Sequence, residues 1–292
     1  MGFKSFRHKK HELIFKNIYL SILETRPTCQ RPGQPGRVIF FLHGRFGSAE
    51  MWNAIMDSLS GQFRCIAIEL PGFGSSTLKS SKTLSFIEYA ILVNEVVMSF
   101  TKDVDQAVLV GHDLGGALAQ WCLSRNPHKV ASLMLINSLS LSRALKPLIK
   151  SPNLGLQEFW VSFWLHRLLQ QSRLVDASCC QGLGTAWVSS IQAIEESWPG
   201  LSDRRFWKEA LAGFVHPVLL LWGKRDSLNA PEIASDLVQM FRNTDYFLNE
   251  DTGHWPFLEQ KDWVLAKFKT FLFKTDVDHC AWLRPSTALK SG

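Results

Sequence analysis

Short runs of consecutive apolar residues alternate along the chain with longer segments in which apolar residues recur at helical spacing. A strand that is apolar at every position must be covered on both faces, which is typical of a parallel sheet between layers of helices. The expected strands are 38–42, 65–70, 107–110, 132–137, 218–222 and 245–248. The expected helices are 49–60, 83–100, 114–126, 230–241 and 262–273, with Ser48 capping the first and Pro127 ending the third. The sequence therefore predicts an α/β fold with a mostly parallel sheet flanked by helices.

The alternation stops between residues 139 and 210, where no convincing strand occurs and aromatic residues recur at helical spacing. We interpret 139–210 as a helical cap, a substrate lid inserted into a core that comprises 1–138 and 211–292. The expected hinges are 138–142 and 212–216. The tail after Lys274 is expected to be loosely attached, with Trp282 as one anchor.

Charge and composition restrict the partners. The formal net charge is +6, and five basic residues among the first sixteen predict a solvated, partly disordered basic terminus. No aromatic-interleaved or amphipathic pattern accompanies these charges, and no apolar run approaches transmembrane length, so neither nucleic acid nor stable membrane insertion is expected. The six cysteines are irregularly spaced, which favours reduced thiols in a cytoplasmic protein. We expect a small-molecule substrate and no metal or cofactor, and we leave the oligomeric state open.

Three chemically capable side chains each follow a predicted strand. Asp113 follows 107–110, Asp226 follows 218–222 and His254 follows 245–248. Ligands of open α/β sheets bind at the carboxyl ends of the strands, so these side chains are expected to meet there. Their order along the chain is nucleophile, acid and histidine.

The segment around Asp113 has the composition of a sharp strand-to-helix turn. Gly111, Gly115 and Gly116 give strand and helix room to pass closely, which allows the residue between them to project its side chain as a nucleophile. The helix that follows directs backbone N–H groups at developing negative charge. We predict Leu114 N–H as one oxyanion donor and Arg45 N–H as the second.

Five motifs occur in a recognisable order. They are HGRFGS at 43–48, LPGFGSS at 70–76, GHDLGG at 111–116, WGKRD at 222–226 and GHWPFLE at 253–259. Together they resemble the α/β-hydrolase superfamily, over about residues 15 to 273. Within it, a Gly-His-Asp elbow is similar to that of the dehalogenase and epoxide-hydrolase branches. The resemblance implies an α/β-hydrolase fold with an Asp-nucleophile triad of Asp113, Asp226 and His254.

An aspartate at the nucleophile position changes the chemistry. A carboxylate is already ionised and attacks an electrophilic sp³ carbon directly, which produces an alkyl ester on Asp113. His254, oriented by Asp226, then activates a water that hydrolyses this ester. Attack by carboxylate on an ordinary ester gives a mixed anhydride, which is no more stable than the substrate. The expected substrates are small and apolar: alkyl halides, haloacids or epoxides.

The sequence departs from both branches. Haloalkane dehalogenases usually place tryptophan after the nucleophile and often asparagine after His-Gly, where this chain has Leu114 and Arg45. Epoxide hydrolases usually have two cap tyrosines, but Tyr19, Tyr89 and Tyr246 all lie outside the expected cap. Haloacetate dehalogenases place arginine beside the nucleophile. A cap rich in tryptophan and lacking tyrosine favours carbon–halogen cleavage over epoxide opening.

Several side chains are candidates for the substrate pocket. Arg45 would bind a carboxylate or halide if its side chain turns inward, and faces solvent otherwise. Five tryptophans lie between residues 160 and 207, and one of them would donate its indole N–H to a leaving group. His43 is expected to brace its loop, and the side chain of His112 to point away from the pocket. The predicted pocket residues are His43, Phe46, Trp160, Trp164, Trp187 and Trp255.

A second resemblance leaves another function open. HGRFGSAEMW at 43–52 together with LPGFGSS looks like small carboxylesterases and the cyclohexadiene-carboxylate synthases of menaquinone synthesis, which use serine. On that ancestry Asp113 would abolish ester hydrolysis. The chain would then be an esterase-derived lyase or a ligand-binding protein without turnover.

Overall fold

The computed structural model describes residues 8–15, 18–27, 38–78, 83–101, 106–143, 145, 185–198 and 204–282. Within these residues the strands form one nine-stranded sheet in the order β1-β2-β4-β3-β6-β7-β8-β9, with β5 beside β2. The strands are β1 Lys9–Phe15, β2 Ile18–Thr25, β3 Val38–Leu42, β4 Arg64–Ile68, β5 Thr77–Leu78, β6 Ala107–His112, β7 Val130–Ile136, β8 Val218–Gly223 and β9 Thr244–Asn249. From β4 through β9 every pairing is parallel. The predicted α/β-hydrolase fold class is therefore confirmed.

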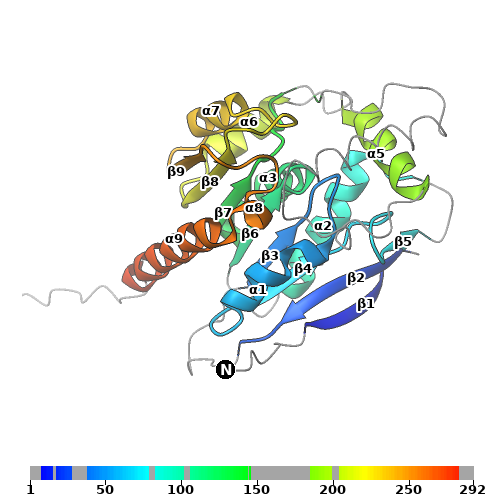
Figure 1. The fold of residues 1–292 in the computed structure, drawn as a ribbon, viewed down its shortest axis with the longest axis horizontal. Helices are drawn as coiled ribbons and strands as arrows, with labels where there is room; N and C mark the ends of the chain where they lie inside the picture. Colours follow the sequence, from blue (N-terminus) through cyan, green and yellow to red (C-terminus); the bar gives the residue numbers. More distant parts are fainter. Residues whose placement is uncertain are drawn as a thin grey trace, which may run out of the picture.

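Two layers of helices cover the sheet (Figure 1). Helices α1 and α9 contact each other on one face, and α2 and α3 contact each other on the opposite face. The helical segments are η1 Ala49–Trp52, α1 Asn53–Leu59, α2 Phe86–Phe100, α3 Leu114–Arg125, η2 Pro127–Lys129, α5 Thr185–Ser197, α6 Arg204–Ala212, α7 Glu232–Met240, α8 Pro256–Glu259 and α9 Lys261–Trp282. Every residue of β3, β6, β7 and β8 is buried, as their continuous apolar sequences require.

The N-terminal expectation was wrong for the residues that the structure describes. Lys9–Phe15 forms edge strand β1, paired antiparallel with β2. From Lys10 to Ile14 exposed side chains alternate with half-buried ones. His11 contacts Glu24 at 2.7 Å, and Lys10 donates to Ser75 Oγ at 2.9 Å. Charged residues on an edge strand prevent unwanted pairing, so a basic sequence and a strand are compatible here.

Two helix ends also differ from expectation. Ser48 makes no capping hydrogen bond; instead, the Ala49 N–H donates to Glu69 Oε1 at 3.0 Å. The last helix continues to Trp282, so the segment directly after Lys274 is helical rather than a loose tail. The side chain of Trp282 lies outside the described residues. Pro127 does follow the end of α3, as predicted.

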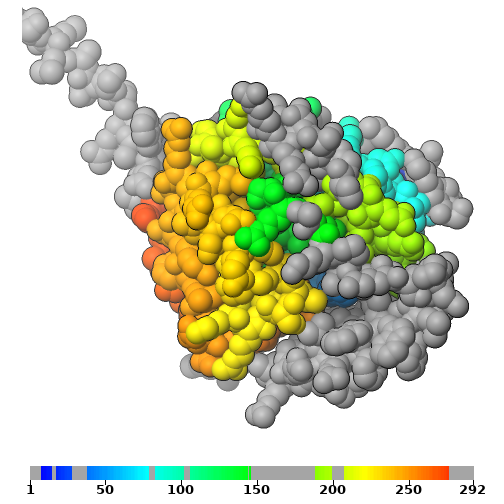
Figure 2. All heavy atoms as spheres, turned by 90° about the horizontal axis from the view of Figure 1, so that it is seen from above, coloured from blue at the N-terminus to red at the C-terminus, as the bar shows by residue number. Residues whose placement is uncertain are grey.

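The predicted cap lies mostly outside the described residues, and only helices α5 and α6 of it can be placed. Helix α5 contacts α2, and Trp198 after α5 packs edge-to-face on Phe86 with ring centroids 4.7 Å apart. From above, the segment after β7, drawn in green, lies between α5 and the yellow segments that include α6 (Figure 2). In the described part of the chain, no helix is both long and apolar enough to cross a membrane.

Candidate active site

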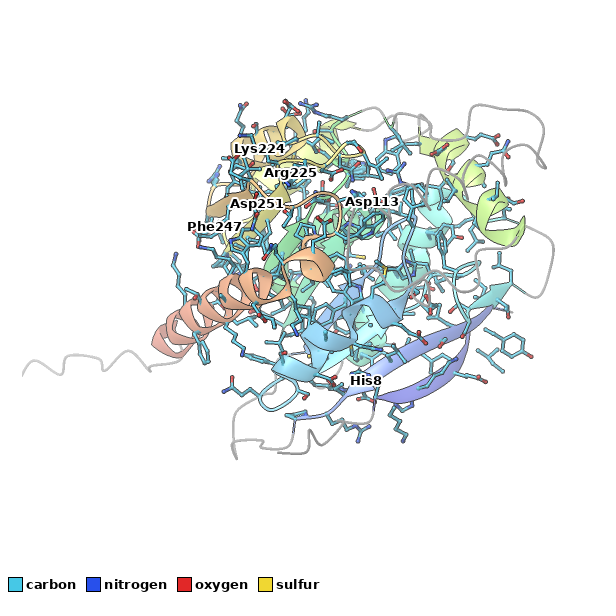
Figure 3. All side chains as sticks on the ribbon, viewed as in Figure 1. His8, Asp113, Lys224, Arg225, Phe247 and Asp251 are labelled. Atoms are coloured by element: carbon cyan, nitrogen blue, oxygen red, sulfur yellow. The ribbon has the colours of Figure 1, made fainter. Side chains whose placement is uncertain are left out.

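Asp113 lies at the junction of β6 and α3, where the chain makes a strained turn. Its backbone has φ 48° and ψ −115°, a conformation that is rare for residues other than glycine. The close approach of strand and helix explains Gly111, because a Cβ there would lie 2.4 Å from the Gly115 carbonyl oxygen. Figure 3 shows Asp113 at the upper end of the sheet, where β6 ends. The elbow predicted from the glycines is thus formed.

The side chain of Arg45 turns inward and binds the carboxylate of Asp113. Arg45 Nε and Nη2 donate to Oδ2 and Oδ1 at 3.0 and 2.8 Å, and the Arg45 backbone N–H donates to Oδ2 at 2.8 Å. Asn229 Nδ2 donates to Oδ1 at 2.8 Å. Four hydrogen bonds therefore saturate this fully buried carboxylate.

The same contacts fix the charge of Asp113. Burial alone raises the pKa of the carboxyl group, but the charge and hydrogen bonds of Arg45, followed by the charge of His254, hold the pKa far below its ordinary value. Arg45 is itself fully buried and stays charged, because Asp113 and, at 3.5 Å, Glu195 Oε1 of α5 oppose the cost of its burial. Asp113 is therefore an anion in the resting site.

His254 and Asp226 form the second charged pair of the site. His254 Nδ1 lies 2.9 Å from Asp226 Oδ2, and both side chains are buried. Burial lowers the pKa of His254, but the charge and hydrogen bond of Asp226, and then the charge of Asp113, raise it above its ordinary value. Burial alone raises the pKa of Asp226. The charge and hydrogen bond of His254 and the hydrogen bond from Asn137 outweigh burial, so this pKa lies below its ordinary value.

Asn137 supports the acid of this pair. It follows β7 with φ 43°, and its Nδ2 donates to Asp226 Oδ2 and to the Gly253 carbonyl oxygen. Its Oδ1 accepts from the Gly223 N–H at 3.1 Å. The ends of three segments, after β7, β8 and β9, are thereby joined behind the Asp226–His254 pair.

Two further histidines brace the loops of the site. His43 Nε2 accepts from the Leu70 N–H at 3.0 Å, and Nδ1 lies 2.9 Å from the Gly44 carbonyl oxygen, so Nδ1 is the protonated nitrogen. Burial lowers the pKa of His43 to about 4, and the ring is neutral. His112 Nε2 lies 2.8 Å from the carbonyl oxygen of His254, with its pKa lowered to about 3 chiefly by burial. Both rings hold backbone in place.

Glu69 is buried beside the neutral His43. Because His43 Nε2 already accepts a hydrogen bond from the Leu70 N–H, its 3.4 Å contact with Glu69 Oε1 is not an ion pair. Burial raises the pKa of Glu69 to about 7, against the backbone N–H of Ala49 that favours the charged form. Glu69 anchors the loop that presents Arg45, and the sequence offered only its position before LPGFGSS as a signal.

The predicted pocket aromatics are only partly placed. Trp160 and Trp164 lie outside the described residues, as does the side chain of Trp187. Trp198 donates its indole N–H to the Arg143 carbonyl oxygen at 3.1 Å, so it does not serve a leaving group. The buried Trp207 belongs to α6. Phe46 is buried, with Arg45 Cζ 5.9 Å from its ring centre, and the rings of Trp255 and His254 pack with centroids 4.9 Å apart. The pocket roles of Phe46 and Trp255 stay predictions, as does the role of the Leu114 N–H as an oxyanion donor.

Sequence reasoning missed Asn229, the side chain that joins the two pairs. Its Nδ2 binds Asp113, and its backbone N–H donates to Asp226 Oδ1 at 2.9 Å. It lies three positions after Asp226 in the loop after β8, which is the only signal that the sequence contains. Tyr89 does not serve a leaving group, because its OH donates to the Pro71 carbonyl oxygen at 2.5 Å.

A fold of this topology, with an elbow, an acid after β8 and a histidine after β9, defines an α/β hydrolase. The family model described as "Alpha/beta hydrolase family" matches residues 39–267, and the chain belongs to that family. Among curated relatives, a pimeloyl-[acyl-carrier protein] methyl ester esterase of Vibrio parahaemolyticus is 27% identical over 81% of this chain and 94% of its own length.

Solved structures share the fold. Haloalkane dehalogenase DbeA from Bradyrhizobium elkani superposes with a TM-score of 0.76 at 18% identity, over 93% of this chain and 100% of its own. A putative lipase from Acinetobacter baumannii has a TM-score of 0.69 at 19% identity, with 93% of each chain covered. At these identities the likeness concerns the fold alone. The family and the relatives together identify a hydrolase of the α/β fold.

Proposed function

We propose that this hydrolase cleaves a carbon–halogen or epoxide bond of a small substrate through an alkyl ester on Asp113. The single observation that carries this proposal is the buried, ionised Asp113 in the elbow, with Oδ2 on the Arg45 N–H at 2.8 Å. A serine hydrolase holds the substrate's carbonyl oxygen on such a donor. Here the enzyme's own carboxylate occupies it, which is the arrangement required when the ester to be hydrolysed is on the enzyme.

In the first step Asp113 Oδ1 gives up one of its two hydrogen bonds, from Arg45 Nη2 or Asn229 Nδ2, and attacks an sp³ carbon while the bond to the leaving atom breaks. Negative charge then moves from Asp113 to the leaving group. In-line displacement expels the leaving group on the side of the carbon opposite to Oδ1, so the Arg45 guanidinium, 2.8 Å from Oδ1, balances the charge of the carboxylate before the transfer.

In the second step a water attacks Cγ of the ester, and His254 accepts the proton. Formation of the ester removes the charge of Asp113, which contributes to the raised pKa of His254, whereas the opposing charge of Arg45 remains. The pKa of His254 therefore falls in the ester intermediate, and the ring becomes neutral at lower pH. Alkylation itself prepares the base for the hydrolytic step.

An esterase-derived activity is the second candidate, and the methyl ester esterases among the relatives favour it. On this alternative His254 activates water against a substrate ester without any covalent step, and Asp113 with Arg45 serves binding. The occupied Arg45 N–H argues against it, because an ester oxygen would have to displace Asp113 Oδ2 from that donor.

Trapping the ester tests the proposal. His254→Gln, incubated with 1-bromobutane, 2-chloropropionate or styrene oxide, is expected to retain the alkyl group on the peptide that contains Asp113, visible as a mass increase. His128→Gln, an exposed position on η2, is the matched control and is expected to turn over without an adduct. Absence of any adduct, together with hydrolysis of methyl esters by the wild-type protein, would establish the second candidate instead.

A further inference from the structure

We infer that Asn229 is a further catalytic residue, which together with His254 holds the water that hydrolyses the ester on Asp113. The inference rests on the proposed function and adds a residue to its second step. Its basis is a pair of buried polar atoms, Asn229 Oδ1 and His254 Nε2, that have no hydrogen-bond partner among the described residues.

The orientation of the Asn229 amide follows from its neighbours. Asp113 Oδ1 and the Asn137 carbonyl oxygen both lie 2.8 Å from the amide nitrogen, and both only accept hydrogen bonds. A flipped amide would place its oxygen against two acceptors. The nitrogen therefore faces them, and Oδ1 is left as an unsatisfied acceptor on a residue that is 1% exposed.

The carboxylate of Asp226 fixes both unsatisfied groups. Its Oδ1 accepts from the Asn229 backbone N–H at 2.9 Å, and its Oδ2 pairs with His254 Nδ1 at 2.9 Å. Since Nδ1 carries the proton that binds Asp226, Nε2 of neutral His254 is also an acceptor. The Asn229 amide bonds to Asp113 Oδ1 at 2.8 Å and the charge of Asp113 acts on His254, so both acceptors belong to side chains beside Asp113.

A water molecule is the ligand that two acceptors need, because it has two protons to donate. Leaving a buried polar group unsatisfied is costly, so a water that satisfies both atoms is favoured. With its two O–H bonds directed at Asn229 and His254, the oxygen lone pairs are free for another atom. The carboxyl group of Asp113, bonded to Asn229 itself, is the electrophile within reach once it is an ester.

Hydrolysis of the Asp113 ester transfers both protons of the water in turn. The water oxygen bonds to Cγ of the Asp113 ester while one proton passes to His254 Nε2, and the charge on Oδ2 is held by the Arg45 N–H. The bond from Cγ to the alkoxy oxygen then breaks, and the alkoxide takes the proton from His254. The second water proton, directed toward Asn229 Oδ1 during attack, remains on the Asp113 carboxyl group and is lost to solvent as that group ionises.

A crystal structure of the wild-type protein tests the water site without any substrate. We expect an ordered water within about 3.2 Å of both Asn229 Oδ1 and His254 Nε2. In Asn229→Ala the water should be lost or displaced, whereas Asn94→Ala, which removes a partly buried asparagine of α2, should retain it. Density that shows no water shared by the two atoms would overturn the inference.

Kinetics separate a catalytic role from a structural one. With a substrate that alkylates His254→Gln, Asn229→Ala should slow decay of the ester by about 10- to 100-fold, the scale expected when a reacting group is misplaced. Alkylation should change much less, because the lost hydrogen bond frees Asp113 Oδ1. A merely structural role would slow both steps to a similar extent, because Asn229 bonds to both Asp113 and Asp226. Equal slowing of the two steps, or an unchanged decay of the ester, would overturn the inference.

The two proposals fail in different ways. If the shared water is present but His254→Gln forms no ester, the proposed function is wrong, and with it the catalytic role of Asn229. If the ester forms in His254→Gln but its decay is unaffected in Asn229→Ala, only the role of Asn229 is wrong.

Discussion

Two buried charge pairs lie side by side in the site, and they differ in how completely they are satisfied. In the Arg45–Asp113 pair, every carboxylate lone-pair direction has a donor. In the Asp226–His254 pair, the carboxylate is equally well bound, but His254 Nε2 has no partner among the described residues. The carboxylate of the Arg45–Asp113 pair is therefore fully hydrogen-bonded and permanently charged, whereas the Asp226–His254 pair ends in an imidazole nitrogen that can titrate.

The difference assigns separate tasks to the pairs. A guanidinium does not lose its proton, so the first pair can manage a transfer of negative charge but not of a proton. An imidazole whose second nitrogen is unengaged can accept a proton near neutral pH. Asn229 bonds to the carboxylates of both Asp113 and Asp226 and so fixes the spacing of the two charge pairs.

The largest effect is expected from Asp113→Asn, which breaks the first pair alone. Turnover should fall by about 10⁴-fold or more, because an amide does not form the ester. Stability should fall by about 3–5 kcal/mol, because Arg45 is left buried without its counter-charge. Turnover of a substrate from the panel and the urea midpoint measure these two losses. Retention of turnover would show that the first pair only binds.

Arg45→Met breaks the same pair from the other side and should have the next largest effect. Asp113 then remains a buried carboxylate with only Asn229 as a side-chain donor, so its pKa should rise steeply. We expect a loss of about 3–5 kcal/mol near neutral pH and recovery of part of it on acidification, when Asp113 takes up a proton. Urea unfolding at several pH values measures both. Arg45→Lys should lose less stability, since it keeps the charge without the fork of donors.

The pH dependence should separate the two pairs in the wild-type enzyme. Because the pKa of Asp113 is far below 3.8, alkylation is expected to be level between about pH 5 and pH 9. Ester hydrolysis needs neutral His254, so its rate should rise with pH, with an inflection below that for His254 in the free enzyme, where Asp113 is charged. Rapid-quench mass spectrometry distinguishes the steps. Equal pH profiles for both steps would remove the distinction between the pairs.

Stability should respond to pH with opposite signs at the two pairs. Asp113 has a lowered pKa, so its contribution is present above 3.8 and is lost as pH falls toward the folded-state value. His254 has a raised pKa, so its contribution is complete below 6.5 and is lost as pH rises through the folded-state value. The first loss accompanies acid denaturation, and the second lies on the alkaline side of 6.5.

The sequence predicted the backbone of the site better than its hydrogen bonds. Strand 38–42 was placed to the residue, and Asp113, Asp226 and His254 follow β6, β8 and β9, because continuous apolar runs and glycines are strong local signals. The inward turn of Arg45 depends on a contact 68 residues away, and the same arginine is compatible with solvent until the elbow exists. The role of Asn229 is equally hard to predict from the sequence, because its amide has a defined orientation only when the fold brings Asp113 and Asn137 beside it.

Strand β1 is a backbone element that the sequence does not predict. A run containing Lys9, Lys10 and Glu12 has the composition of a solvated terminus, and only pairing with β2 makes it a strand. Edge strands need few apolar residues, since one side and much of one face meet water. Composition therefore says little about a segment whose structure depends on its neighbour.

The smallest expected effect concerns the contact between the Arg45–Asp113 pair and helix α5. Glu195 of α5 lies 3.5 Å from Arg45 Nη1, longer than the bonds to Asp113, so Glu195→Gln should cost about 1 kcal/mol or less. If Arg45 couples α5 to the charge of Asp113, hydrogen exchange of α5 should quicken in Glu195→Gln. Glu196→Gln, on the exposed side of the same helix, is the matched control. An equal change in both variants would mean that Glu195 contributes only helix propensity, and that the Arg45–Asp113 pair acts independently of helix α5.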